Sequence, residues 1–167
     1  MIIKEIKLSS YPYVSRRGLS EYLAKHYFLK KGYTVFRGHM VLGKAYSLYY
    51  PLYPNVQNKY NLLERILLQK LQLLLYLLRD DLKKQQGGLP DFFCYKKEDM
   101  FFAEIKLEHE QLKKNQLQCI RLLERYGFEV LVFRLKKRIY REVIHYDLDT
   151  NVKSVLLKQE KMKLHWK

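Results

Sequence analysis

The chain contains few cysteines and far fewer acidic than basic residues. Its two cysteines, Cys94 and Cys119, are too few for a disulfide framework, a four-cysteine zinc site or an iron–sulfur cluster. Each lies among apolar residues, a setting that predicts a buried and reduced thiol.

Long apolar runs are also missing. The N-terminal segment lacks the apolar core and small-residue cleavage site of a secretory signal peptide. The most apolar stretch, residues 62–78, is shorter than the about 20 residues that a membrane-spanning helix needs. It is also interrupted by Glu64, Arg65, Gln69, Lys70 and Gln72. We therefore expect an intracellular protein that is neither secreted nor embedded in a membrane.

The shortage of acidic residues leaves a strongly basic chain. Lysine and arginine number 32 against 17 aspartates and glutamates, which gives a formal net charge of +15. Such an excess indicates a polyanionic partner, most simply nucleic acid. A negatively charged membrane surface and a generally lysine-rich composition are the alternatives that composition leaves open.

The length of 167 residues suits a single domain, 1–167, with a sizeable core. Residues 38–58 show no clear period, and we expect a loop there. We expect residues 59–84 to form a long Leu-rich helix. It is apolar nearly all round in its middle, so it should be buried in the domain or against a second subunit. The other expected elements are a helix at 19–31, a strand at 33–37, a hairpin of strands at 91–95 and 100–107, a helix at 110–126, a strand at 128–135 and a small hairpin within 143–157.

This order of elements predicts an α/β fold with a mixed sheet flanked by helices. The Leu-rich helix would then belong to a helical insertion at about residues 40–86.

Three ionisable residues stand out in the predicted hairpin. Asp91 opens its first strand directly after a proline, while Glu104 and Lys106 lie on the second strand. Alternation along a strand places Phe102, Glu104 and Lys106 on one face. Charged groups in an apolar strand are costly unless they are paired or bind a ligand. Two close carboxylates attract a hard divalent cation, and a neighbouring lysine can orient water, a set that suits metal-assisted hydrolysis of a phosphodiester.

The Glu-x-Lys pattern by itself has low specificity. Glu5-Ile6-Lys7 has the same form, as does Asp81-Leu82-Lys83. Taken alone, Glu104 and Lys106 could be an ion pair on a solvated edge strand. The Pro90-Asp91 pair at a suitable distance is what favours the catalytic interpretation.

Gln116 provides a further indication. It falls near the centre of the inward face of the helix at 110–126, where a glutamine needs a buried hydrogen-bond partner. That partner could be the catalytic lysine or the scissile phosphate. A purely structural hydrogen bond is the alternative. The other residues of this face are Leu112, Cys119, Ile120 and Leu123.

Four motifs within residues 87–135 together resemble the VRR-NUC family of the PD-(D/E)xK nuclease superfamily. They are Gly87-Gly88-Leu89-Pro90-Asp91-Phe92-Phe93, Phe102-Ala103-Glu104-Ile105-Lys106, Leu112-Lys113-Lys114-Asn115-Gln116 and Gly127-Phe128-Glu129-Val130. The order and spacing match the family pattern of a G-x-P-D strand, an E-x-K strand, a helix with an N-Q pair and a turn into the last core strand. The resemblance implies a restriction-endonuclease-like core.

The resemblance also implies roles for the matching residues. Asp91 and Glu104 would be ligands of Mg²⁺ or Mn²⁺, with the backbone carbonyl of Ile105 as a further ligand. Lys106 would position the attacking water or stabilise developing charge. Gln116 would support the lysine or the phosphate.

Two further positions follow from the resemblance. The family has a glutamate on its first helix, a place that Glu21 fits, as a metal ligand, although an ordinary surface glutamate is the alternative. Family members often have glycine after the catalytic lysine, whereas this chain has Leu107-Glu108, so the strand could continue further. The Leu-rich helix lies where the family is variable.

We therefore expect a metal-dependent DNA endonuclease, selective for branched DNA such as Holliday junctions, acting as a homodimer in DNA repair or recombination. The alternatives are a flap nuclease, a less selective DNase, or a non-catalytic nucleic-acid-binding module on the same fold. The expected contacts with the DNA backbone are Arg16, Arg17, Lys113, Lys114, Lys136, Lys137 and Arg138.

Overall fold

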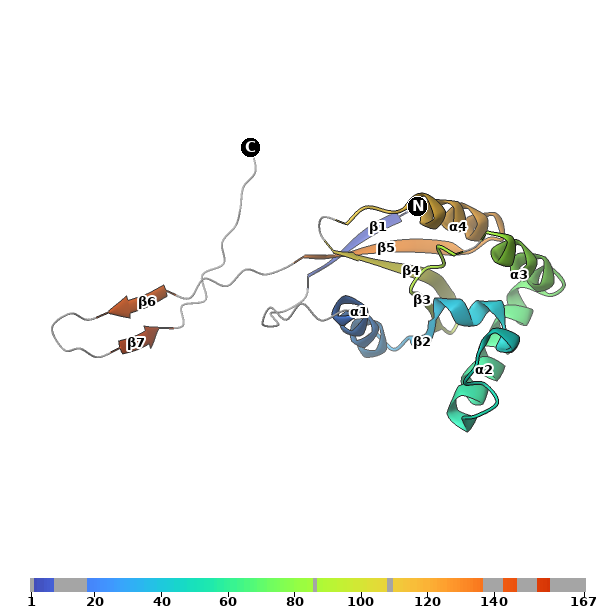
Figure 1. Ribbon diagram of the computed structural model, residues 1–167, viewed down its shortest axis with the longest axis horizontal. Coiled ribbons are helices and arrows are strands. Elements are labelled where there is room, and N and C mark those ends of the chain that lie inside the picture. The colour runs from blue at the N-terminus through green and yellow to red at the C-terminus, as the bar shows by residue number, and fades with distance from the viewer. Residues whose placement is uncertain are drawn as a thin grey trace.

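The computed structural model describes residues 2–7, 18–85, 87–107, 110–136, 143–146 and 153–156. Its main sheet has five strands in the order β1-β5-β4-β3-β2 (Figure 1). The central strand β4 runs parallel to β5 and antiparallel to β3, so the sheet is mixed and the predicted α/β class is confirmed. The bounds are Ile2–Lys7 for β1, Thr34–Arg37 for β2, Phe92–Lys96 for β3, Asp99–Leu107 for β4 and Glu129–Lys136 for β5.

The predicted hairpin is confirmed as β3 and β4. Phe92 pairs with Ala103 and Lys96 pairs with Asp99, so a tight turn with Lys97 at φ 55° joins the strands. Asp91 therefore lies just before β3, beside the middle of β4. Strand β4 runs on to Leu107, as the missing glycine after Lys106 suggested.

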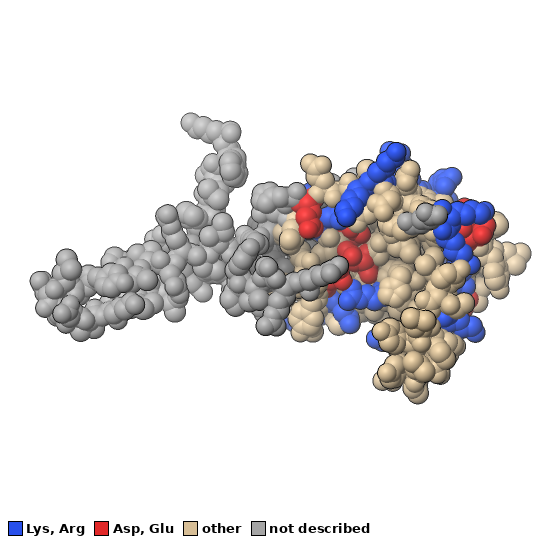
Figure 2. Space-filling view, in the orientation of Figure 1, with Lys and Arg blue, Asp and Glu red and all other residues tan. Residues whose placement is uncertain are grey.

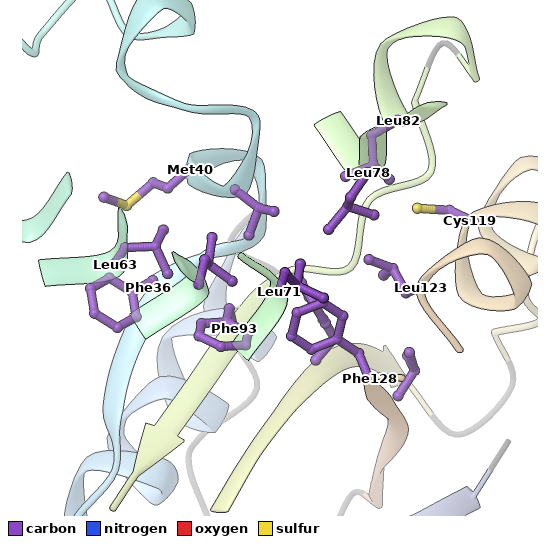
Figure 3. Close-up of a cluster of buried hydrophobic side chains, with 14 of the residues drawn as sticks. Phe36, Met40, Leu63, Leu71, Leu78, Leu82, Phe93, Cys119, Leu123 and Phe128 are labelled. Carbon is purple, nitrogen blue, oxygen red and sulfur yellow. The ribbon is translucent and has the colours of Figure 1, made fainter. Parts of the chain in front are cut away.

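The two faces of the sheet are covered by different helices. Helix α1 (Leu19–Lys30) packs on one face, where the ring of Phe28 lies edge-on to Phe101 and Phe133 with centroids 5.9 and 4.9 Å apart. Helices α2 (Pro54–Leu71), α3 (Leu74–Lys84) and α4 (Lys114–Arg125) share a core with the other face. Figure 3 shows this core, in which side chains from α2, α3 and α4 meet the aromatic rings of the sheet.

The long helix predicted at 59–84 is instead two helices. Helix α2 begins at Pro54, inside the stretch expected to be a loop, because proline is well suited to the first helical turn. Two short 3₁₀ helices, η1 (Gly38–Leu42) and η2 (Lys44–Tyr46), occupy part of the same stretch. Gln72 has φ 49° and ψ −123°, which breaks the helix between α2 and α3.

Within the single chain this helical region is buried on one face only. One face is buried and includes Leu63, Leu67, Leu75 and Leu78. The opposite face exposes large apolar side chains, namely Leu62, Leu68, Leu73, Leu74, Tyr76 and Leu77. Burial of this face against a second subunit remains a prediction.

Two pieces of the fold lie at the ends of the described chain. The sequence indicated no strand at its start, yet Glu5-Ile6-Lys7 belongs to β1, which pairs in parallel with β5. The predicted small hairpin is confirmed as β6 (Val143–Tyr146) and β7 (Lys153–Leu156), which pair antiparallel. None of the helices in the part of the chain that the structure describes is long and apolar enough to cross a bilayer. Cys94 and Cys119 are buried and unbridged, as expected.

Candidate functional site

The segment that leads into β3 packs against the backbone of η1 on one side and against the start of α4 on the other. The N–H of Gly38 donates to the carbonyl of Asp91 at 2.9 Å, and a Cβ on Gly38 would lie 1.8 Å from the carbonyl oxygen of Pro90. Gly88, at φ 81°, approaches the start of α4 so closely that a Cβ would lie 2.4 Å from the carbonyl oxygen of Asn115. Only glycine permits these contacts, which fix the position of Asp91 relative to α4.

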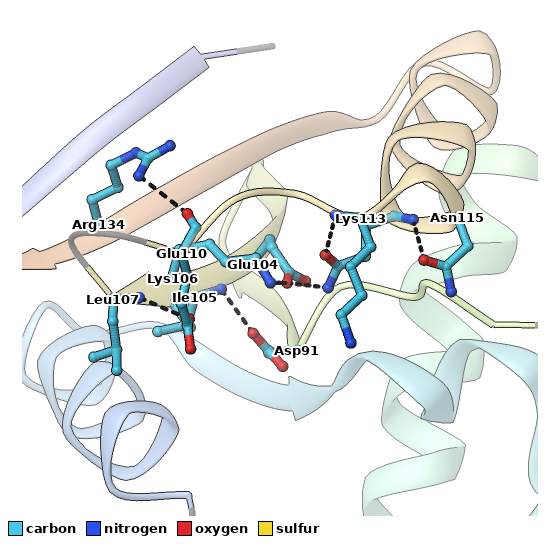
Figure 4. Close-up of polar contacts among 10 residues, drawn as sticks. Asp91, Glu104, Ile105, Lys106, Leu107, Glu110, Lys113, Asn115 and Arg134 are labelled. Carbon is cyan, nitrogen blue, oxygen red and sulfur yellow. Dashed lines mark hydrogen bonds and ion pairs between the residues drawn. The ribbon is translucent and has the colours of Figure 1, made fainter.

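Asp91 and Glu104 lie side by side. The Oδ2 atom of Asp91 accepts a hydrogen bond from the N–H of Ile105 at 2.7 Å (Figure 4). The backbone N–H of Asp91 in turn faces the carboxylate of Glu104. The predicted approach of Asp91 to Glu104 across the hairpin is thus confirmed.

Two cationic or amide groups meet the same carboxylate. Lys106 Nζ lies 2.9 Å from Oε1 of Glu104. Gln116 Nε2 donates to the same oxygen at 2.6 Å. Gln116 belongs to the first turn of α4, and its Oε1 accepts a hydrogen bond from the N–H of Lys113 at 3.0 Å. The sequence predicted that Gln116 faces the candidate site, with Lys106 or a phosphate as its partner. In the structure its side-chain partner at the site is Glu104.

Two of the charged residues of the site are buried, and its carboxyl groups are shifted toward their protonated forms. Glu104 is only 3% exposed and Lys106 only 8%. Burial raises the pKa of Glu104 to about 7, and the neighbouring charge of Asp91 raises it further against the opposing effect of Lys106. Burial also raises the pKa of Asp91, and the charge of Glu21 adds to this effect. Two carboxylates whose charged forms are disfavoured in this way would be stabilised by an additional cation.

The oxygen donors fit a cation that keeps some of its water. Within the described residues, no group of three or more His, Cys, Asp and Glu side chains is arranged to hold a metal ion. Mg²⁺ is nevertheless commonly held by one or two carboxylates, together with waters and substrate phosphates. Asp91 and Glu104 provide such a pair, and both need to be deprotonated to bind.

Glu21 lies near this pair but is engaged elsewhere. Its carboxylate forms an ion pair with Arg37 at the end of β2. The Arg37 guanidinium also lies 5.1 Å from the ring centroid of Phe92, the residue after Asp91. Sequence reasoning did not find Arg37, and its place as the last residue of a strand beside β3 is recognisable only from the sheet order.

The predicted DNA contacts are only partly described. Lys113 and Lys114 are exposed at the start of α4, and Figure 4 shows the Lys113 side chain extending on the same side as Asp91. Lys136 lies at the end of β5, although only its backbone is described. The remaining positions, Arg16, Arg17, Lys137 and Arg138, lie outside the described residues.

Comparison with known proteins gives no match to this chain among family models, curated proteins or solved structures. The resemblance to the VRR-NUC family therefore stays a prediction based on the motif residues. The spatial arrangement of those residues is the basis on which a function is proposed below.

Proposed function

We propose that this chain is a metal-dependent DNA nuclease with a PD-(D/E)xK core of the VRR-NUC type. The observation that carries the proposal is the convergence of Asp91, Lys106 and Gln116 on the buried carboxylate of Glu104. These residues come from the start of β3, from β4 and from α4, and the contacts of Lys106 and Gln116 with Glu104 measure 2.9 and 2.6 Å. Three elements that are separate in sequence thus bring all four residues of the proposed centre together.

Asp91 and Glu104, with the backbone carbonyl of Ile105, would hold Mg²⁺ or Mn²⁺ in this proposal. When bound, such an ion lowers the pKa of a coordinated water and stabilises charge on a phosphate oxygen. The pKa of Glu104, about 7, means that this carboxyl group must lose a proton as the cation binds. Glu21 would become available as a further metal ligand if its ion pair with Arg37 opened.

Lys106 and Gln116 have different roles. The ammonium of Lys106 lies 2.9 Å from Glu104, within reach of a water or phosphate oxygen held at that carboxylate. Gln116 is a positioning residue. Because its Oε1 accepts from the N–H of Lys113, its Nε2 must face Glu104 and fix the orientation of that carboxylate.

A purely structural ion pair explains the arrangement less well. Lys106 would suffice to balance Glu104, and a second, half-buried carboxylate beside the pair would then only add repulsion. Burial raises the pKa of each carboxyl group, and the charge of Asp91 further raises that of Glu104 despite the opposing effect of Lys106. A bound cation would stabilise the charged forms of both groups.

DNA is the proposed substrate because of the net charge of +15 and the exposed Lys113 and Lys114 beside the site. The preference for branched DNA and the homodimer rest on the family resemblance. Two active sites in a dimer would make the paired cuts that resolution of a four-way junction requires.

The test is cleavage of an end-labelled four-way junction, a linear duplex and a 5′ flap with Mg²⁺, Mn²⁺ or EDTA. We expect cleavage with either metal, none with EDTA, and none for Asp91→Ala. Symmetric cuts confined to the junction would support the branched-DNA proposal, whereas cutting of every substrate would leave a nuclease without that selectivity. Salt-sensitive binding without cleavage by the unmodified chain would contradict the proposed activity and favour a binding module.

A further inference from the structure

A short segment between η1 and α2 presents aromatic rings to solvent. The side chains of Tyr46, Tyr49 and Tyr53 are 53%, 63% and 54% exposed. The rings of Tyr49 and Tyr53 lie next to each other, with centroids 6.3 Å apart and planes inclined by 39°. Figure 2 shows the lobe around α2 as a mostly tan surface, in contrast to the mixed charges over the rest of the described face. Several large exposed side chains gathered in one short segment are typical of a surface that binds a partner.

The charged groups at these rings are all basic. Lys83 Nζ lies 4.9 Å from the ring centroid of Tyr46, and Lys44 Nζ lies 5.7 Å from that of Tyr50. Residues 38–63 contain no aspartate or glutamate at all. A segment with exposed rings, neighbouring cations and no acidic residue of its own is suited to a partner that has both flat apolar faces and negative charge.

The segment is attached firmly to the candidate site. It follows η1, whose first residue, Gly38, donates its N–H to the carbonyl of Asp91 at 2.9 Å. Arg79 of α3 donates to the carbonyl of Val41 at 2.9 Å and forms a two-point ion pair with Glu64 of α2. A strand bound on this segment would therefore have a fixed position relative to Asp91.

We propose that Tyr46, Tyr49 and Tyr53 form a stacking surface for the unpaired bases of single-stranded DNA, with Lys44 and Lys83 near its phosphates. This inference rests on the proposed function only for the choice of DNA as the ligand. It adds that the substrate has a single-stranded portion and that this portion lies along the segment before α2. Base stacking on aromatic rings does not depend on sequence, because every base has a π face.

Charge decides between this ligand and a second copy of the chain. Leu48 and Leu52 are 86% and 65% exposed in the same segment and would suit an apolar protein partner. A second copy, however, would carry its own net charge of +15 to rings that are contacted by the lysines Lys44 and Lys83. A polyanionic strand is attracted to the same surface.

The experiment measures binding of a fluorescently labelled oligothymidylate by anisotropy in EDTA, with the full chain and at several salt concentrations. One double variant, Tyr49→Leu with Tyr53→Leu, keeps the apolar character but removes the rings. A matched double variant, Tyr49→Phe with Tyr53→Phe, keeps the rings. We expect the leucine pair to weaken binding by at least about tenfold with an unchanged salt dependence, and the phenylalanine pair to bind like the unmodified chain.

Equal binding by the leucine pair and the unmodified chain would overturn the proposal, as would no binding by the unmodified chain. So would a dimer in sedimentation that both double variants retain, with DNA binding unchanged in the leucine pair. As a second measurement on the unmodified chain, photocrosslinking to bromodeoxyuridine in the oligonucleotide should label residues 46–53, and labelling confined to other residues would contradict the proposal. The binding assay contains no metal, so it is independent of cleavage. Ring-dependent binding can be observed even if the chain does not cleave DNA, and cleavage can be observed even if binding does not depend on the rings.

Discussion

Glu104 is the residue at which the contacts of the candidate site converge. It is 3% exposed, and its Oε1 is contacted by both Lys106 and Gln116. Its pKa is raised to about 7, firstly by burial and secondly by the charge of Asp91. In the folded chain Glu104 therefore holds its proton more tightly than an unfolded glutamate does.

This shift predicts how stability depends on pH in the absence of metal. A raised pKa in the folded state stabilises the fold fully below the ordinary value of 4.5, and this contribution is lost as the pH rises through about 7. Glu104→Gln removes the titrating group, so stability should fall less steeply between these pH values than in the unmodified chain. Urea unfolding at a series of pH values in EDTA measures the difference, and parallel curves for the two proteins would contradict it. Metal affinity should rise over the same pH range, because binding requires the deprotonated carboxylate.

Substitution of Gly38 by alanine should lower both the stability of the fold and the cleavage activity. Its Cβ in Gly38→Ala would lie 1.8 Å from the Pro90 carbonyl oxygen, so the segment that holds Asp91 must move. We expect a loss of about 2–3 kcal/mol in the free energy of unfolding. A shift of about 1 Å in Asp91 should also lower cleavage by about 100-fold.

A matched substitution separates the close contact from general effects of a lost glycine. Gly127 has φ 77° but no heavy atom within 4 Å of its would-be Cβ. Gly127→Ala should lower stability by about 1 kcal/mol through backbone strain and leave cleavage per folded molecule unchanged. If Gly38→Ala cleaved DNA as well as Gly127→Ala does, the close approach would have no part in positioning Asp91.

For single residues, the sequence predicts the direction of a side chain where the residue lies on a regular strand or helix. Alternation along a strand correctly placed Glu104 and Lys106 on one face, and helical spacing placed Gln116 inward. Arg37 and Gly38 could not be found in this way. Their contacts with the site depend on β2 lying next to β3, a long-range arrangement that no local pattern encodes.

At the scale of elements, the break between α2 and α3 is a test of backbone strain. Gln72 has φ 49° and ψ −123°, a conformation that is comfortable only for glycine. Gln72→Gly should therefore raise the free energy of unfolding by about 1 kcal/mol. Thermal or urea unfolding measures the change.

The neighbouring Leu73 provides the control. It has right-handed helical angles, φ −64° and ψ −26°, and is 81% exposed, so glycine gains nothing there. Leu73→Gly should lower stability by about 0.5–1 kcal/mol. Similar losses in both variants would show that Gln72 is not strained.

The helical region also shows why the sequence prediction was incomplete. Six of the eight residues at 71–78 are leucines, and no proline or glycine marks the break at Gln72, so the sequence predicts one long helix. The break turns α3, so that Leu75 and Leu78 reach the core while Leu73 and Leu77 stay exposed. Residues 54–58 were expected to be loop because they show no apolar period, yet they form the first turns of α2.

At the scale of the whole molecule, the net charge of +15 predicts strong salt dependence of DNA binding. Counterion release makes the logarithm of affinity fall linearly with the logarithm of salt concentration. If about 6–10 phosphates are contacted, affinity should fall by about 10³–10⁵-fold between about 50 and 200 mM salt. Filter binding in EDTA measures the slope, and a flat response would mean that the basic residues do not contact the DNA backbone.

The fold class followed from the order of the elements, but the complete sheet did not. The predicted hairpin and the strand at 128–135 gave the strands β3, β4 and β5. Strand β1 was missed because Ile2–Lys7 is short, rich in charge and pairs with residues more than a hundred positions away. Long-range parallel pairing of this kind is not visible in local periodicity.

The most direct test of the account is single-turnover cleavage of labelled four-way junction DNA with Mg²⁺ by the unmodified chain, Asp91→Asn and Asp99→Asn. Both substitutions exchange the same groups on the same hairpin, but Asp99 is exposed at the turn, where it accepts a hydrogen bond from Tyr33. The account predicts cleavage by the unmodified chain and by Asp99→Asn, and none by Asp91→Asn. Equal cleavage by all three proteins would show that Asp91 and its neighbours are not the catalytic centre.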